Sequence, residues 1–231
     1  MTVLHLLSGG AAQALVQQLQ APFLAHSGCT IDGGFGAVGL MKERLLAGQP
    51  CDVIILTQAL IEQLIASGHA RAGSAQPLGI VKTGIAVKTG AVCPAVDRPQ
   101  TLKAALLAAR GIYFPDPVKA TAGIHFMNVL QRLGIADELA PRLHAFPNGA
   151  TAMAAMAQAP GSGLIGCTQV TEILFTPGVQ LVAPLPREFE LATVYTAALC
   201  TQAAQPQAAA ELIRLLSSPQ TAAQRRALGF E

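Results

Sequence analysis

The sequence is poor in charged and aromatic residues. Only 12% of its 231 residues are Asp, Glu, Lys or Arg, 4% are aromatic, and Trp is absent. The net charge is +2, and Lys and Arg form no basic run. Because nucleic acids and anionic membranes bind concentrated positive charge, we expect neither as the main partner. With 52% hydrophobic residues and so little charge, the composition also excludes a disordered chain.

Long hydrophobic runs are missing as well. No stretch approaches the roughly 18 apolar residues of a membrane helix, so we expect no membrane insertion. The N-terminal segment has no Lys or Arg before Lys42, and its apolar run stops at Ser8. This pattern predicts a first β-strand rather than a secretory signal, and with it a cytoplasmic location, or a periplasmic one if a signal peptide was removed.

The five cysteines are widely spaced and include no Cys-x-x-Cys pair. This usage is typical of reduced thiols that pack as small hydrophobic side chains. The five His residues show no spacing with Cys, Asp or Glu that predicts a zinc site. Neither a phosphate loop nor a dinucleotide fingerprint is present. We therefore expect no metal and no organic cofactor.

Strand-like and helix-like segments alternate along almost the whole chain. Residues 52–56 form a short apolar run typical of a buried strand, whereas residues 12–23 carry apolar side chains at helical spacing. A helix is predicted over residues 121–133, with Thr121 as its N-cap. This alternation predicts an α/β fold with a mostly parallel sheet.

Two changes of rhythm predict two lobes rather than one sheet. Residues 71–77 are rich in Gly, Ser, Ala and Pro, and the chain returns to an Ala-rich helical pattern after residues 192–198. We expect one lobe from residues 1–82 and 200–231, and a second from residues 83–195. The hinge would then lie near residues 80–85 and 195–200.

Three segments bring small residues to the junction between a strand and the next helix. They are Ser8-Gly9-Gly10, the stretch from Gly34 to Gly39, and Ala120-Thr121-Ala122-Gly123. The first amides of a helix have no intrahelical partner and lie at the positive end of its dipole, so they bind anions. A glycine there leaves room for a ligand to approach the backbone. The alternative interpretation of these segments is that they are only tight turns between a strand and a helix.

Five stretches carry a resemblance to a known family: Ser8–Leu15, Leu45–Thr57, Thr83–Ala91, Ile112–Phe126 and Leu216–Phe230. Through them the chain resembles the molybdate-binding branch of the type 2 solute-binding proteins, almost from end to end. The resemblance implies two α/β lobes on a two-strand hinge that close over an oxyanion. It also implies that backbone amides and Ser and Tyr hydroxyls hold the ligand.

Several of the implied hydroxyl positions differ here. Gly10 follows the first strand where the branch has Ser, Ala37 lies in what is a Ser-rich loop, and Gly166 replaces a Tyr. Each lost donor costs about 1–3 kcal/mol of recognition, so a small tetrahedral dianion is disfavoured and the site is enlarged. We therefore expect a larger anion, such as a di- or tricarboxylate.

Aconitate isomerase is a relative of this branch, and its reaction is an allylic 1,3-proton shift that needs no cofactor. The resemblance thus implies a cofactor-independent isomerase acting on such a carboxylate in the cleft between the lobes. The alternative is a non-catalytic oxyanion-binding protein of a molybdate-type importer, or a cytoplasmic anion sensor. The sequence leaves the oligomeric state open.

The chemistry of the reaction selects the candidate residues. His125 is the first candidate for the proton transfer, with an ordinary pKa near 6.5, unless it is a core or surface His. Glu172 is the second, unless it caps a helix or faces water, while Asp116 between two prolines is a turn former. The expected ligand-binding residues are Ser8, Gly9, Gly10, Gly36, Ala37, Thr57, Thr83, Lys119, Thr121, Ala122, Gly123, Thr168 and Gln169.

Overall fold

The computed structural model describes residues 2–231, which form two compact units. Unit 1 contains residues 2–81 and 193–231, and unit 2 contains residues 82–192. The chain therefore passes between the units after Val81 and again after Ala192. The α/β class predicted from the sequence is confirmed, whereas the hinge positions stay a prediction.

The sheet of unit 1 has the strand order β2-β1-β3-β9. Strand β1 (Thr2–Gly9) pairs in parallel with β2 (Cys29–Gly36) on one side and β3 (Val53–Thr57) on the other. Strand β9 (Ala192–Leu199) is antiparallel to β3. Because β3 is buried on both faces, its sequence Val-Ile-Ile-Leu is apolar throughout rather than alternating.

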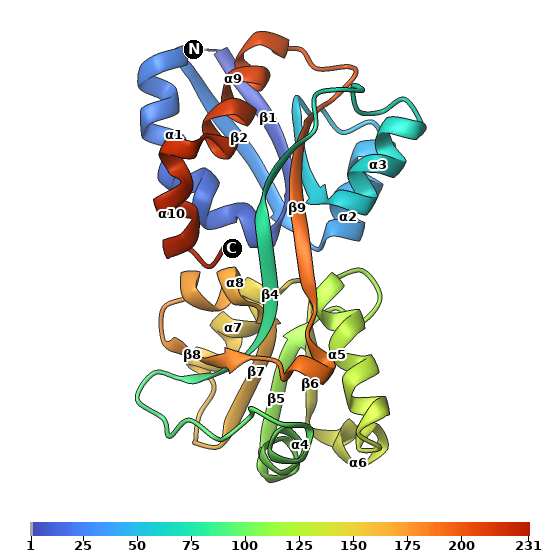
Figure 1. The fold of residues 1–231 in the computed structure, drawn as a ribbon, viewed down its shortest axis with the longest axis vertical. Coiled ribbons are helices and arrows are strands. Elements are labelled where there is room, and N and C mark those ends of the chain that lie inside the picture. The colour runs from blue at the N-terminus through green and yellow to red at the C-terminus, as the bar shows by residue number, and fades with distance from the viewer. Residues whose placement is uncertain (1) are drawn as a thin grey trace. The chain divides into compact units, whose positions relative to one another are not determined.

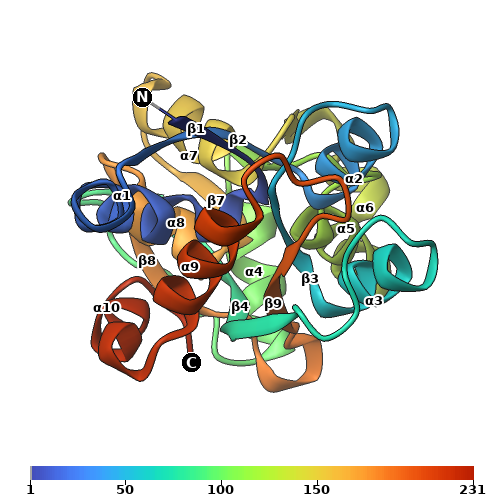
Figure 2. The same cartoon turned by 90° about the horizontal axis from the view of Figure 1, so that it is seen from above.

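Helices cover both faces of this sheet (Figures 1 and 2). One face carries α1 (Gln13–Ser27), α9 (Pro206–Ser217) and α10 (Ala222–Ala227), and the other carries α2 (Val38–Leu46) and α3 (Gln58–Ala66). The apolar stripes predicted from helical spacing are the buried ones: Leu15 and Leu19 of α1 lie in one core with Leu212 and Leu216 of α9. Two short 3₁₀ turns, Gly10–Ala12 and Pro219–Thr221, precede α1 and α10.

Unit 2 is built around the parallel strands β5 (Gly111–Pro115), β6 (Leu143–Phe146) and β7 (Leu164–Gln169). Strand β4 (Gln76–Lys88) is antiparallel to both β7 and β8 (Val179–Pro184). The sheets are thus mixed: a group of three parallel strands lies in each unit, as predicted, and the antiparallel direction of strands β4, β8 and β9 was not predicted. The antiparallel pairs all involve β4 or β9, whose apolar composition is equally compatible with either direction.

Seven helical segments accompany these strands. They are α4 (Pro99–Ala108), α5 (Thr121–Arg132), α6 (Ala136–Leu139), α7 (Gly149–Gln158), α8 (Val170–Phe175) and the 3₁₀ turns Ala140–Arg142 and Arg187–Phe189. The buried side chains form two separate clusters: Phe126 of α5 lies in one, and Met153 of α7 lies in the other. Within the described residues, no helix is both long and apolar enough to cross a membrane.

The predicted N-cap of α5 was wrong by one residue. The cap is Ala120, and no side chain caps the helix, while Thr121 is its first residue. The preceding turn is held instead by the Asp116 carboxylate, which accepts hydrogen bonds from the amides of Val118 (2.7 Å) and Lys119 (2.9 Å). Since this turn already orients the chain, a hydroxyl cap is not needed.

A buried carboxylate joins three segments of unit 1. Asp52, 1% exposed, accepts a hydrogen bond from the amide of His5 (2.7 Å) in β1 and another from the amide of Gln205 (2.8 Å), the N-cap of α9. Its carbonyl accepts from the amide of Cys200 (2.9 Å), just after β9. Asp52 therefore fixes the start of β3 against both neighbouring strands.

We expect Asp52→Ala to lower the free energy of unfolding by about 2–4 kcal/mol, because two amides lose a charged acceptor. Urea denaturation followed by circular dichroism measures this loss. The control is Asp137→Ala, at an exposed position in α6, which should change stability by less than about 0.5 kcal/mol. Equal effects of the two substitutions would contradict the role assigned to Asp52.

Candidate functional site

In unit 1, two of the three small-residue turns meet at the carboxyl ends of parallel strands. Gly9, the last residue of β1, pairs with Gly36, the last residue of β2. On the other side of β1, Ser8 pairs with Ile55, and β3 ends two residues later at Thr57. Ligands of α/β sheets bind at this edge, where each strand leads into a helix.

The helices that begin at this edge leave their first amides without side-chain caps. Ala37 is the N-cap of α2 and Thr57 the N-cap of α3, and neither helix has a side-chain cap hydrogen bond. A Cβ on Gly9 would lie 2.8 Å from Val38 Cγ1, so glycine is what allows α2 to begin so close to β1. Both helix N-termini therefore suit a negatively charged group.

The hydroxyl of Ser8 is already used inside its own turn. Ser8 is fully buried, and its Oγ donates a hydrogen bond to the carbonyl of Gly9 (2.8 Å). Sequence reasoning missed Tyr195, whose ring lies against Gly9 and which pairs with Thr57 across β3 and β9. The sequence feature that could have identified Tyr195 is its residue type, because it is one of only two Tyr in the chain and lies in a strand of mostly small residues.

Unit 2 repeats the arrangement with its own three parallel strands. Pro115 at the end of β5 pairs with Phe146 at the end of β6, and Tyr113 pairs with Gly166 in β7. Each of these strands is followed by a helix, namely α5, α7 and α8 in turn. The starts of these helices therefore lie at one edge of the sheet of unit 2.

Glu172 is the central group at this edge. It is buried in the first turn of α8, and its Oε2 accepts a hydrogen bond from Thr168 Oγ1 (2.6 Å). The backbone amides of Gly149, Ala150 and Gln169 also bind its carboxylate, which lowers its pKa, but burial outweighs them and the pKa is raised above its ordinary value. Glu172 thus caps the N-terminus of α7, one of the two alternatives that the sequence left open.

Gly149 is required by this contact. A Cβ at that position would collide with Thr168 Oγ1 and with the carboxylate of Glu172. The sequence analysis did not select Gly149. The Asn148-Gly149 pair, which follows a short apolar segment, could have indicated a helix start at this position. Asn148 accepts a hydrogen bond from the amide of Thr151 (2.9 Å) and is the N-cap of α7.

Four buried polar atoms beside Glu172 have no hydrogen-bond partner among residues 2–231. They are Thr83 Oγ1, Thr171 Oγ1 and both amide atoms of Gln169, whose side chain is 3% exposed. Thr83 of β4 pairs directly with Gln169 of β7, so both side chains lie on the same face of the sheet. A buried polar atom without a partner costs about 1–3 kcal/mol, which a bound ligand or water can recover.

Two further expected site residues, His125 and Gly123, are explained by contacts within unit 2. His125 is half-buried, and its Nε2 bonds the carbonyl of Phe189 (2.7 Å), which ties α5 to the 3₁₀ turn 187–189. A Cβ on Gly123 would collide with the carbonyls of Pro115 and Asp116, so packing alone requires this glycine. The polar contacts of His125 and of Glu172 therefore lead to different parts of unit 2.

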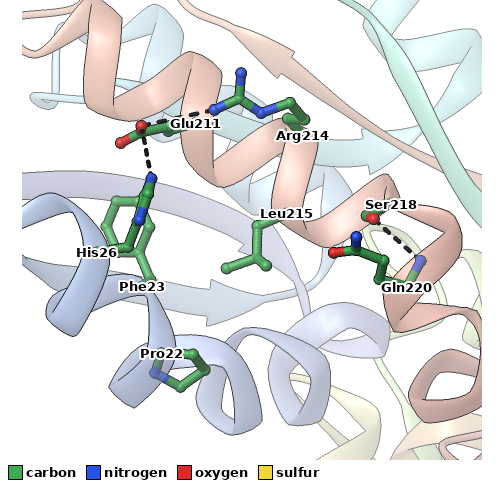
Figure 3. A pocket seen from close by; sticks show the side chains of 8 residues that line it. All are labelled: Pro22, Phe23, His26, Glu211, Arg214, Leu215, Ser218 and Gln220. Atoms are coloured by element: carbon green, nitrogen blue, oxygen red, sulfur yellow. Dashed lines mark hydrogen bonds and ion pairs between the residues drawn. The ribbon is translucent and has the colours of Figure 1, made fainter.

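A groove of about 450 Å³ lies elsewhere in unit 1, between α1, α9 and residues 218–220 (Figure 3). Phe23 and Leu215 provide apolar lining, and Glu211 pairs with His26 (3.3 Å) and Arg214 (3.6 Å). These residues lie at the end of α1 remote from Gly9, so the groove has no lining residue in common with the edge where β1, β2 and β3 end. Within residues 2–231, no three His, Cys, Asp or Glu side chains are arranged to hold a metal ion.

Comparison with known proteins assigns this architecture to a family. The sequence pattern of the bacterial extracellular solute-binding proteins matches residues 4–231. The chain belongs to this family. An aconitate isomerase from a Pseudomonas species is 24% identical over 227 residues, covering 96% of this chain and 84% of that protein. The suspected resemblance to the molybdate-binding branch is thereby confirmed.

Solved structures of solute-binding proteins share the fold. The periplasmic molybdate-binding protein of Azotobacter vinelandii matches with a TM-score of 0.80 at 20% identity, covering 99% of this chain and 98% of that one. The sulfate-binding protein SubI of Mycobacterium tuberculosis matches with a TM-score of 0.76 at 15% identity, covering 100% of this chain and 86% of that one.

The structure explains why position 166 of this solute-binding protein is a glycine. A Cβ on Gly166 would lie 2.6 Å from Met153 Cε and 3.1 Å from Met156 Cε. Both methionines are fully buried side chains of α7. Because they fill the space above β7, a larger side chain at position 166 would require these methionine side chains to move.

We expect Gly149→Ala to lower the free energy of unfolding by about 1–3 kcal/mol, since the added methyl group overpacks the contact between α7 and Glu172. Chemical denaturation measures the loss. The double substitution Gly149→Ala with Thr168→Ala removes one collision partner, so its cost should be smaller than the sum of the two single costs. Strict additivity would show that Thr168 does not restrict this position.

Glu172 should make stability depend on pH in a defined direction. Its pKa in the folded state is raised above its ordinary value of 4.5, so its contribution is fully present below that pH and is lost as the pH rises through the folded-state pKa. Glu172→Gln abolishes this titration. Urea denaturation from about pH 4.5 to about pH 8 should show the wild type losing stability relative to Glu172→Gln. Parallel profiles would contradict the raised pKa.

Proposed function

We propose that this solute-binding protein binds a small organic anion, a di- or tricarboxylate. The observation that carries the proposal is the group of unpartnered polar atoms on Thr83, Gln169 and Thr171 beside Glu172. Gln169 Nε2 and the threonine hydroxyls suit carboxylate oxygens as donors. Within unit 1, the uncapped N-termini of α2 and α3 offer amides that also suit a carboxylate.

A polycarboxylate fits these residues better than a small tetrahedral dianion. The Ser8 hydroxyl is spent on the carbonyl of Gly9, and Gly10, Ala37 and Gly166 carry no hydroxyl. What the units offer instead are backbone amides, one carboxamide and threonine hydroxyls. The molybdate- and sulfate-binding names of the structural neighbours support an anionic ligand, and the aconitate isomerase supports an organic one.

We propose further that the protein is a cofactor-independent isomerase of the aconitate type. In such a reaction a base removes a proton from the CH₂ group next to a C=C bond, the electron pair shifts to form the new C=C bond, and a proton returns to the far carbon. The step involves no net oxidation. Glu172 is our choice for the base, because it is the buried carboxyl group of this edge and burial raises its pKa above the ordinary value, which makes it a stronger proton acceptor than an exposed carboxylate.

His125 is the second candidate for the proton transfer. Its Nε2 bonds Phe189, so only Nδ1 remains for chemistry. The alternative to catalysis is a binding protein that delivers its anion to an importer. This alternative is supported by the structural neighbours that are named as binding proteins.

The cytoplasmic location expected from the N-terminal sequence has no support from this extracellular family, so we propose a periplasmic location.

Titration calorimetry with cis- and trans-aconitate, citrate, molybdate and sulfate tests the ligand class. We expect tight binding of the polycarboxylates and weak binding of the two inorganic anions. Gln169→Met should weaken carboxylate binding by about tenfold or more, since one lost donor costs about 1–3 kcal/mol. Gln158→Met, at an exposed position of α7, is the matched control. Binding of molybdate alone would overturn the proposed ligand class.

Proton NMR of the protein incubated with either aconitate isomer tests catalysis. We expect interconversion that Glu172→Gln abolishes while carboxylate binding is retained, because the amide cannot accept the proton. His125→Ala should leave most of the rate. Loss of activity in His125→Ala with an active Glu172→Gln would reverse the two roles, and binding without interconversion would identify a non-catalytic carrier.

A further inference from the structure

Two cysteines that are far apart in the sequence meet at one end of the β3–β9 pair. Cys51 immediately precedes Asp52 and β3, and Cys200 immediately follows β9. Their Sγ atoms are 3.5 Å apart, and the amide of Cys200 donates to the carbonyl of Asp52 (2.9 Å). Both residues belong to unit 1, so their contact is part of one compact body.

The pair can be reached from solvent. A groove of about 250 Å³ is lined by residues 45–46, 48–51, 68–69 and 200–202, and both cysteines are among them. Cys51 is 8% exposed and Cys200 1% exposed. Cys51 also directs its thiol towards the carbonyl of Val53 (3.1 Å). A disulfide of a small thiol therefore has access to Cys51 first.

We propose that Cys51 and Cys200 form a disulfide by exchange with a disulfide oxidant. The Cys51 thiolate attacks the oxidant R–S–S–R, which forms a mixed disulfide and releases one R–S⁻. Cys200 sulfur then attacks Cys51 Sγ, the mixed disulfide breaks, and the second thiolate leaves. The two thiol protons end on two R–SH molecules, so the cysteine pair is oxidised and the oxidant is reduced.

The surroundings set the order of the two steps. The contact with Cys51, burial and the nearby Asp52 carboxylate all raise the pKa of the Cys200 thiol, so Cys200 is a poor first nucleophile. The two Sγ atoms are 3.5 Å apart and must approach by a further ~1.5 Å to form a disulfide bond of about 2.05 Å. The backbones of β3 and β9, which the cysteines flank, are already paired. Cys51 therefore attacks first, and Cys200 closes the bond.

The bond would join the two chain segments that make up unit 1. The cysteines are 149 residues apart, and the whole of unit 2 lies between them in the sequence. Such a link stabilises chiefly by restricting the unfolded chain, and more so for a long loop. It lies at the start of β3, whereas Thr57 lies at the end, so carboxylate binding should be unaffected.

The experiment uses the full chain carrying Cys93→Ser, which removes the exposed thiol. The folded protein is incubated with oxidised glutathione, quenched with N-ethylmaleimide, digested and analysed by mass spectrometry. We expect a linked peptide pair containing Cys51 and Cys200, and a melting temperature higher by about 5–10 °C. Cys29 and Cys167 should carry the maleimide label after unfolding.

Two matched variants, Cys51→Ser and Cys200→Ser in the same background, keep the proposal falsifiable. Neither should gain thermal stability with oxidised glutathione, and Cys200→Ser should retain a glutathione adduct on Cys51. The proposal is overturned if folded Cys93→Ser yields no linked peptides, or if a stable adduct on Cys51 replaces the disulfide. Carboxylate binding measured on the same samples keeps this result separate from the proposed function.

Discussion

The parallel pairing of strands is the constraint on which the candidate site depends. Each unit contains three mutually parallel neighbours, β2-β1-β3 in unit 1 and β7-β5-β6 in unit 2. Parallel strands direct their carboxyl ends to one edge, and a helix begins after each of them. The amides of those helix starts are therefore gathered without any cationic side chain. This explains how so weakly charged a chain can belong to a family that binds solutes.

The buried carboxylate of Glu172 shows that the helix starts are not all available to a ligand. The amides of Gly149 and Ala150 already bind this carboxylate, so the N-terminus of α7 is neutralised from within the chain. Among residues 82–192, buried polar side-chain atoms without a hydrogen-bond partner lie instead on Thr83, Gln169 and Thr171. A titratable carboxyl group thus stands beside the donors that we assign to the ligand, which is the arrangement that a proton transfer to or from a bound acid requires.

Much of the fold could be predicted from the sequence, because hydrophobic periodicity and small-residue turns are local signals. The strand predicted over residues 52–56 and found as β3, and the helix predicted over residues 121–133 and found as α5, are examples. The direction of β4 and β9 could not be predicted, since an apolar strand reads the same in either direction. The short α6 and β6 were also missed, because four residues carry too little periodicity.

The site was predictable in part for the same reason. Gly9 and Gly36 were singled out locally, and their pairing follows from the parallel register of β1 and β2. Tyr195 and Gly149 were not, because their importance comes from contacts with residues far away in the sequence. Conversely, Gly123 had the expected residue type for an anion turn but is explained by its close approach to the carbonyls of Pro115 and Asp116.

The discontinuous composition of unit 1 has a consequence for biosynthesis. Strand β9, which pairs with one edge of β3, is synthesised only after the 111 residues of unit 2, residues 82–192. Until then the apolar edge of β3 has no permanent neighbour on that side and is open to pairing with other chains. Unit 2 is one continuous segment, so all of its residues are available before those of unit 1. Unit 1 contains the N-terminal residues, but it is completed last, because it needs residues 193–231.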